Sequence, residues 1–162
     1  MTVFLCGGYF GFSMVASHKK EEKMLRQIIT AIGYMQCEIQ YRLTPLPQLL
    51  GQASKQVNGT IGAVLVSLAK ELETQILPDV SCCMAAILRQ KTDIPGCIQE
   101  VLFFLGQCLG RFDLQGQVQE LDAVNSLCQH HLSKLENNRD TRLRSYQTLG
   151  LCAGAAAAIL LL

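Results

Sequence analysis

The sequence has no charged residue near either end. All 14 Lys and Arg and all 13 Asp and Glu fall between Lys19 and Arg144 of the 162 residues. The net charge is only +1. Nucleic-acid binding needs a basic stripe that neutralises phosphates, and this composition offers none.

Motifs for nucleotide and metal chemistry are also missing. The chain contains no GxxxxGK[ST] loop, no GxGxxG turn and no CxxC pair. Cys128, His130 and His131 come nearest to a metal cluster, but zinc needs four converging ligands and adjacent histidines leave a helix on different faces. The carboxylates are scattered singly, whereas acid–base catalysis needs two held close together. We therefore predict a non-enzymatic protein without metal or cofactor, with a solvated histidine pair.

The two uncharged ends are predicted to be membrane anchors. Residues 1–18 and 145–162 each comprise 18 residues, about 27 Å as a helix, slightly under the roughly 20 residues usually needed to span a bilayer. The alternatives are a cleaved signal peptide at the N-terminus and a buried core helix at the C-terminus. Basic residues follow the first segment and precede the second, so the positive-inside rule puts residues 19–144 in the cytoplasm.

Eight cysteines would suggest disulfide bonds in a small secreted protein. A cytoplasmic domain is reducing, and Cys6 and Cys152 fall inside the apolar ends. The other six are predicted to be small buried hydrophobic residues. This includes Cys82 and Cys83, because a disulfide between helical neighbours would be strained. A secreted, disulfide-bonded helical protein remains the alternative.

Between the anchors, apolar residues recur at helical spacing and no segment alternates like a strand. We predict an all-α, single-domain bundle of about six helices whose first and last helices extend into the anchors. The first ends near Leu43, and Thr44 caps a short second helix with Pro45 at its first position. The others are expected at about 60–75, from Pro78 to 91, from a cap at Thr92 or Asp93, and from a cap at Asp113. The predicted inner faces are formed by Leu25, Ile28, Ile32, Met35, Ile39, Leu43, Leu46, Leu49, Leu50, Ala53, Ile61, Leu65, Leu68, Leu72, Ile76, Val80, Met84, Ile87, Leu88, Ile98, Leu102, Leu105, Leu109, Leu114, Val118, Leu121, Val124, Cys128, Leu132 and Leu135.

Three blocks of sequence resemble the stage III sporulation protein AB family of endospore-forming bacteria. Residues 38–50, EIQYRLTPLPQLL, look like its E-I-x-Y-x-x-T-P-L-P-x-x-L block. Residues 105–117 are similar to its L-G-x-x-L-G-x-x-D-x-x-x-Q block, and residues 146–162 are like its closing segment. The candidate interaction residues come from the first two blocks: Glu38, Tyr41, Arg42, Thr44, Pro45, Leu46, Pro47, Gly106, Gly110, Arg111, Asp113 and Gln117. Of these, Glu38, Arg42, Arg111 and Asp113 are expected to be exposed charges.

The resemblance implies a sporulation-specific platform protein in the mother-cell membrane around the forespore. It also implies a fold similar to the cytoplasmic domain of type II secretion and type IV pilus platform proteins. The expected partners are the secretion-type ATPase, stage III sporulation protein AA, and the other membrane subunits of the channel complex. A generic small membrane accessory or sensor protein is the alternative.

Overall fold

The computed structural model describes residues 2–42, 44–74, 79–109 and 116–137, with side chains from residue 18 onward. Five helices are bounded as follows: α1 Thr2–Arg42, α2 Leu46–Gln56, α3 Thr60–Thr74, α4 Val80–Gln90 and α5 Gly96–Cys108. Residues 116–137 form a further helical segment. The described ranges contain no strand, so the predicted all-α bundle is confirmed for them.

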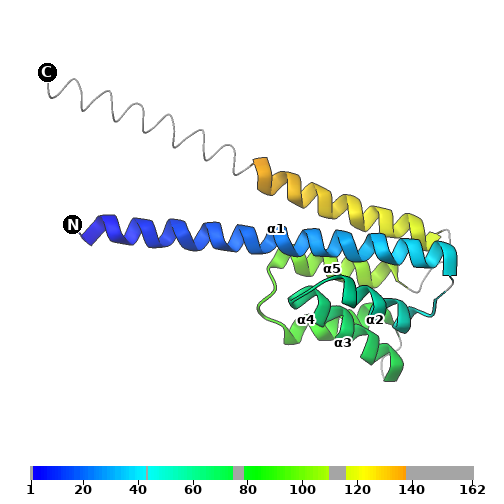
Figure 1. Ribbon diagram of the computed structural model, residues 1–162. Helices are drawn as coiled ribbons and strands as arrows, with labels where there is room; N and C mark the ends of the chain where they lie inside the picture. Colours follow the sequence, from blue (N-terminus) through cyan, green and yellow to red (C-terminus); the bar gives the residue numbers. More distant parts are fainter. Residues whose placement is uncertain (1, 43, 75–78, 110–115, 138–162) are drawn as a thin grey trace, which may run out of the picture.

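The long helix α1 organises the molecule (Figure 1). The segment 116–137 runs antiparallel beside its C-terminal half. Gln36 meets Asp122 at one end of this contact, and Arg26 meets Glu136 at the other. Helices α2, α3 and α5 pack against the same half of α1, whereas α4 packs against α3 and α5. Only the second half of α1 therefore belongs to the bundle, and its first half projects beyond it.

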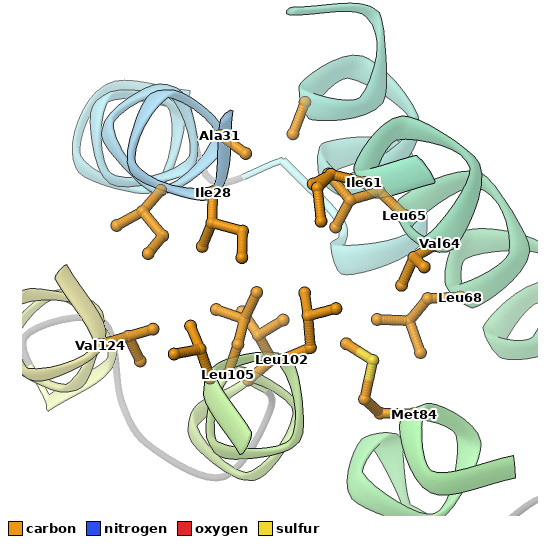
Figure 2. Close-up of a cluster of buried hydrophobic side chains, with 14 of the residues drawn as sticks. Ile28, Ala31, Ile61, Val64, Leu65, Leu68, Met84, Leu102, Leu105 and Val124 are labelled. Atoms are coloured by element: carbon orange, nitrogen blue, oxygen red, sulfur yellow. The ribbon is translucent and has the colours of Figure 1, made fainter. Parts of the chain in front are cut away.

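The core is built by one apolar stripe from each helix, as the spacing predicts. The stripe of α1 is fully buried from Leu25 to Ile39. Figure 2 shows side chains from α1, α3, α4, α5 and the segment 116–137 converging on one cluster, with Leu105 directed toward Val124. The predicted inner faces are thus confirmed where the structure describes them, although Leu46, Leu72, Val118 and Leu135 are only half-buried at the edge of the core.

Pro45 begins α2 after the turn from α1. α1 ends at Arg42, and Pro45, with φ −56° and ψ 140°, occupies the N-cap position of α2. The carbonyl of Pro45 accepts the first helical hydrogen bond, from the amide of Leu49 at 2.9 Å. The predicted cap by Thr44 is wrong. Its hydroxyl bonds to Glu38, and α2 starts one residue later than expected.

Helix α5 also starts later than predicted. Neither Thr92 nor Asp93 caps it, because Pro95 holds the N-cap position with φ −56° and ψ 147°. A proline disfavours helical geometry in the residue before it, so a helix cannot start upstream of Ile94 and continue through Pro95 without strain. Asp93 pairs with Lys20 of α1 instead, at 2.8 Å.

The anchor predictions are not confirmed by the structure. Residues 2–18 form the first part of α1. Within the described residues, no helix has the length and apolarity needed to cross a bilayer. The second anchor, residues 145–162, and the expected cap at Asp113 lie outside the described ranges.

Candidate partner interface

A small polar cluster joins the end of α1 to the start of α2. Glu38 lies at its centre: one carboxylate oxygen accepts a hydrogen bond from the Thr44 hydroxyl at 3.3 Å, and the other is 3.8 Å from the Arg42 guanidinium. Tyr34, one turn earlier on α1, donates its hydroxyl to Gln52 of α2 at 2.9 Å. Burial and the neighbouring Glu38 carboxylate raise the pKa of Tyr34. These bonds fix the direction in which the chain turns.

The outer surface of this corner is formed by residues of the first family-like block. Tyr41 is 78% exposed, and Arg42 and Pro45 are exposed beside it. Leu46 and Pro47 are half-buried, and Leu46 packs against the core. Tyrosine and arginine are the side chains that most often dominate binding at protein interfaces. Tyr41 and Arg42 are exposed beside a turn that hydrogen bonds hold in place, so they are suited to contact a partner.

Glu38 departs from the expectation of an exposed charge. Its side chain is 12% exposed, against 73% for Arg42. The carboxylate is turned toward Thr44 and Tyr34, so Glu38 supports the corner while Arg42 and Tyr41 present its surface. The prediction of exposure is therefore right for Arg42 and wrong for Glu38.

The second family-like block contributes differently. Gly106 is buried where α5 crosses α4, and a Cβ built on it would lie 2.8 Å from the Cβ of Met84. Gln117 is half-buried at the start of the segment 116–137. Gly110, Arg111 and Asp113 lie outside the described residues. Gly106 therefore serves the packing of α5 on α4 and is not part of an exposed interaction surface.

The fold brings the two blocks to one end of the bundle. The amide of Gln36 on α1 donates to the Asp122 carboxylate at 2.7 Å and approaches the carbonyl of Val118 at 3.4 Å. The end of α5, the start of the segment 116–137 and the α1–α2 corner therefore lie close together (Figure 1). Tyr34 and Gln52 were not among the predicted residues. The i,i+4 spacing to Glu38 was a signal for Tyr34, whereas Gln52 is found only by the packing of α2.

The prediction of a solvated histidine pair is right for His130, which is exposed, and wrong for His131, which is half-buried with a buried Nε2. The cysteines are arranged differently from the prediction as well. Cys83, Cys108 and Cys128 are buried and Cys97 is half-buried, but Cys37 and Cys82 are exposed, so the prediction of burial is wrong for these two. All six are free thiols. Burial raises the pKa of both Cys108 and Cys128 to about 12, and a hydrogen bond to Glu120 adds to the effect at Cys108. In the ranges that the structure describes, no group of three His, Cys, Asp or Glu could hold a metal ion.

The described residues form an all-helical bundle. At the end of α1 it exposes a turn that is held by the hydrogen bonds of Glu38 and Tyr34. Comparison with known proteins adds the family. The profile of stage III sporulation protein AB matches residues 1–162, and the chain belongs to that family. No curated protein sequence matches it.

A solved structure of stage III sporulation protein AB is similar in fold. The TM-score is 0.66 at 20% sequence identity, and the match covers 75% of this chain and 98% of the solved one. At this identity the comparison supports the fold alone. The family assignment rests on the sequence profile, and it confirms the resemblance seen in the sequence.

Proposed function

We propose that this stage III sporulation protein is a membrane-anchored platform without enzymatic activity. In this proposal it joins a secretion-type ATPase, stage III sporulation protein AA, to the membrane subunits of the channel between mother cell and forespore. Residues 1–18 and 145–162 anchor it in the mother-cell membrane. Residues 19–144 lie in the cytoplasm and need no cofactor.

The observation that carries the proposal is the position of the α1–α2 corner relative to the residues at which the described chain enters and leaves the bundle. Arg26 on α1 contacts Glu136 near the end of the segment 116–137. The chain therefore enters and leaves the bundle on the same side, which suits two anchors in one membrane. Tyr41 lies at the opposite end of α1, about 33 Å from Lys19 at 1.5 Å per residue. A partner in the cytoplasm would meet this corner first.

The long helix offers a direct connection between the two ends. α1 is unbroken from Thr2 to Arg42, and its second half is buried in the bundle core. A load applied at the corner would pass along one hydrogen-bonded helix toward the membrane. This is the property that a platform between an ATPase and membrane subunits requires.

The test is recovery of the ATPase with the tagged full-length chain from sporulating cells. Tyr41→Ala should lower this recovery about tenfold or more, because the loss of a central aromatic contact typically costs about 2 kcal/mol or more. Phe103→Ala is the matched control, since Phe103 is an exposed aromatic on α5 outside the corner. Equal recovery with both variants, or no ATPase with the unmodified chain, would contradict the proposal.

Two rival functions are less well supported. A generic accessory or sensor protein is disfavoured, because the family match assigns the chain to a stage III sporulation family. A secreted disulfide scaffold is disfavoured, because the six cysteines with described side chains are all free.

A further inference from the structure

A groove of about 480 Å³ separates α1 from the connection between α2 and α3. Its α1 wall is formed by one helix face that carries Lys19, Lys23 and Arg26. The opposite wall is the stretch Gln56 to Asn58. The two walls are joined by a hydrogen bond of 2.8 Å from the Gln27 amide to the carbonyl of Asn58. The groove therefore lies between two segments that are in direct contact.

The groove carries positive charge that the described part of the protein does not neutralise. Glu22 is its one acidic lining residue, and it is paired with Arg26 at 2.9 Å. Arg26 also contacts Glu136. Lys19 and Lys23 are exposed, and neither forms an ion pair with any residue whose side chain is described. Two ammonium groups one helical turn apart are thus free to bind an anion, with polar amides of the opposite wall nearby.

The position of the groove favours one source of anions. Lys19 directly follows the apolar segment 1–18, and Lys19 to Arg26 covers about 10 Å of helix. Each headgroup layer of a bilayer is about 5–8 Å thick. The α2–α3 connection is on the side of the bundle toward the N-terminus of α1 (Figure 1). If residues 1–18 are in the membrane, the groove opens at the level of the lipid phosphates.

We infer that this groove binds a phosphate group, supplied by the headgroup of an anionic lipid, through Lys19 and Lys23. The choice of a lipid as the source rests on the proposed membrane anchoring. The phosphate chemistry rests only on the groove and its unpaired ammonium groups. Bound in this way, a lipid would fix the tilt and rotation of α1 at the membrane surface.

The experiment uses the full-length chain in an uncharged detergent and follows its melting temperature. Phosphatidylglycerol, phosphatidylcholine and inorganic phosphate are titrated separately. Phosphatidylglycerol should raise the melting temperature with a half-saturating concentration that increases with salt. Lys19→Gln with Lys23→Gln should increase that concentration about 30-fold, from roughly 1 kcal/mol for each basic residue near an anionic surface. Lys70→Gln with Arg89→Gln removes two exposed charges elsewhere and should leave it unchanged.

The outcomes separate the sources. If inorganic phosphate raises the melting temperature and phosphatidylglycerol does not, the groove binds a soluble phosphate ligand and the proposal of a lipid ligand is wrong. The site would be overturned if neither phosphatidylglycerol nor inorganic phosphate raised the melting temperature. It would also be overturned if the Lys19/Lys23 and Lys70/Arg89 double variants weakened binding equally. Carbonate extraction of cell membranes tests the anchoring independently: a fully extracted chain contradicts the anchors, and the titration still reports on the groove.

Discussion

Individual residues in this protein do work that their type does not reveal. Gly106 allows α5 to approach α4 so closely that an added Cβ would lie 2.8 Å from the Cβ and 3.1 Å from the Cγ of Met84. Gly33, on α1, has no atom within 4 Å of such a Cβ. The two glycines occupy helices and differ only in their neighbours.

This difference predicts opposite effects of the same substitution. Gly106→Ala should lower the free energy of unfolding by about 1–3 kcal/mol through overpacking. Gly33→Ala should raise it by about 0.5–1 kcal/mol, because alanine has the higher helix propensity. Thermal melting of the full-length chain in detergent measures both. Equal melting temperatures for the two variants would exclude the close α4–α5 contact.

Thiol reactivity gives a second prediction at the scale of residues. At pH 8 a maleimide should label the exposed Cys37 and Cys82 rapidly, and should label Cys108 and Cys128 only after unfolding, because their raised pKa of about 12 keeps them neutral as well as buried. Peptide mass spectrometry assigns the sites. Fast labelling of Cys128 in the folded chain would contradict its burial.

The same two thiols link stability to pH. Their pKa is higher in the folded state than the ordinary value of 9.0. Their contribution to stability is therefore complete below pH 9 and is lost as the pH rises from 9 to 12, because the unfolded chain ionises first. The free energy of unfolding, measured by denaturant titration at rising pH, should fall over this range. In the variant Cys108→Ala with Cys128→Ala, the free energy of unfolding should depend less on pH.

At the scale of elements, two prolines with nearly the same backbone geometry begin two helices. Pro45 and Pro95 both occupy N-cap positions, with φ −56° in each. Pro45 belongs to the corner with Tyr41 and the Glu38 cluster, whereas Pro95 is in the connection beside Lys20 and Asp93. Their local roles are alike, and their surroundings differ.

Replacing the corner prolines should therefore affect partner contact more than folding. In Pro45→Ala with Pro47→Ala, we expect α1 to extend past Arg42, because the barrier to helical geometry at Thr44 is removed. Amide hydrogen exchange should slow across residues 43–46, and sporulation should fail. Pro95→Ala serves as the control and should sporulate. Full sporulation of the double variant at normal protein levels would remove the assigned role of the corner.

At the scale of the whole molecule, the antiparallel contact between α1 and the segment 116–137 brings Arg26 and Glu136 to the same end of the bundle. Their side chains are 3.4 Å apart. In the sequence, basic residues follow the apolar segment 1–18 and precede the apolar segment 145–162. The proposed topology follows from this arrangement and the positive-inside rule.

A membrane-impermeant maleimide tests that topology in intact protoplasts. Cys37 and Cys82 should be unreactive until the membrane is permeabilised, since both are on the domain proposed to be cytoplasmic. A cysteine placed by Thr2→Cys should react without permeabilisation. A second reporter, an enzyme that works only in the cytoplasm, is fused after Leu162. Activity of this reporter would show that the topology is wrong.

Much of the architecture was already determined by the sequence. The stripes from Leu25 to Ile39 and from Leu121 to Leu132 repeat at helical spacing, and such local patterns specify which face of a helix is buried. The block around Pro45 was sufficient to indicate the family. What remained open depended on neighbours distant in sequence. Whether Glu38 is covered or Cys37 exposed is set by the helix that packs on that side.

Only the tertiary structure decided the features that bear on function. It placed the end of α1 beside the start of the segment 116–137, uniting two blocks about 60 residues apart in the sequence. It also set Lys19 and Lys23 across a groove from the stretch Gln56 to Asn58. Periodicity cannot predict such pairings, because it specifies the buried face of each helix and leaves open which helix covers it.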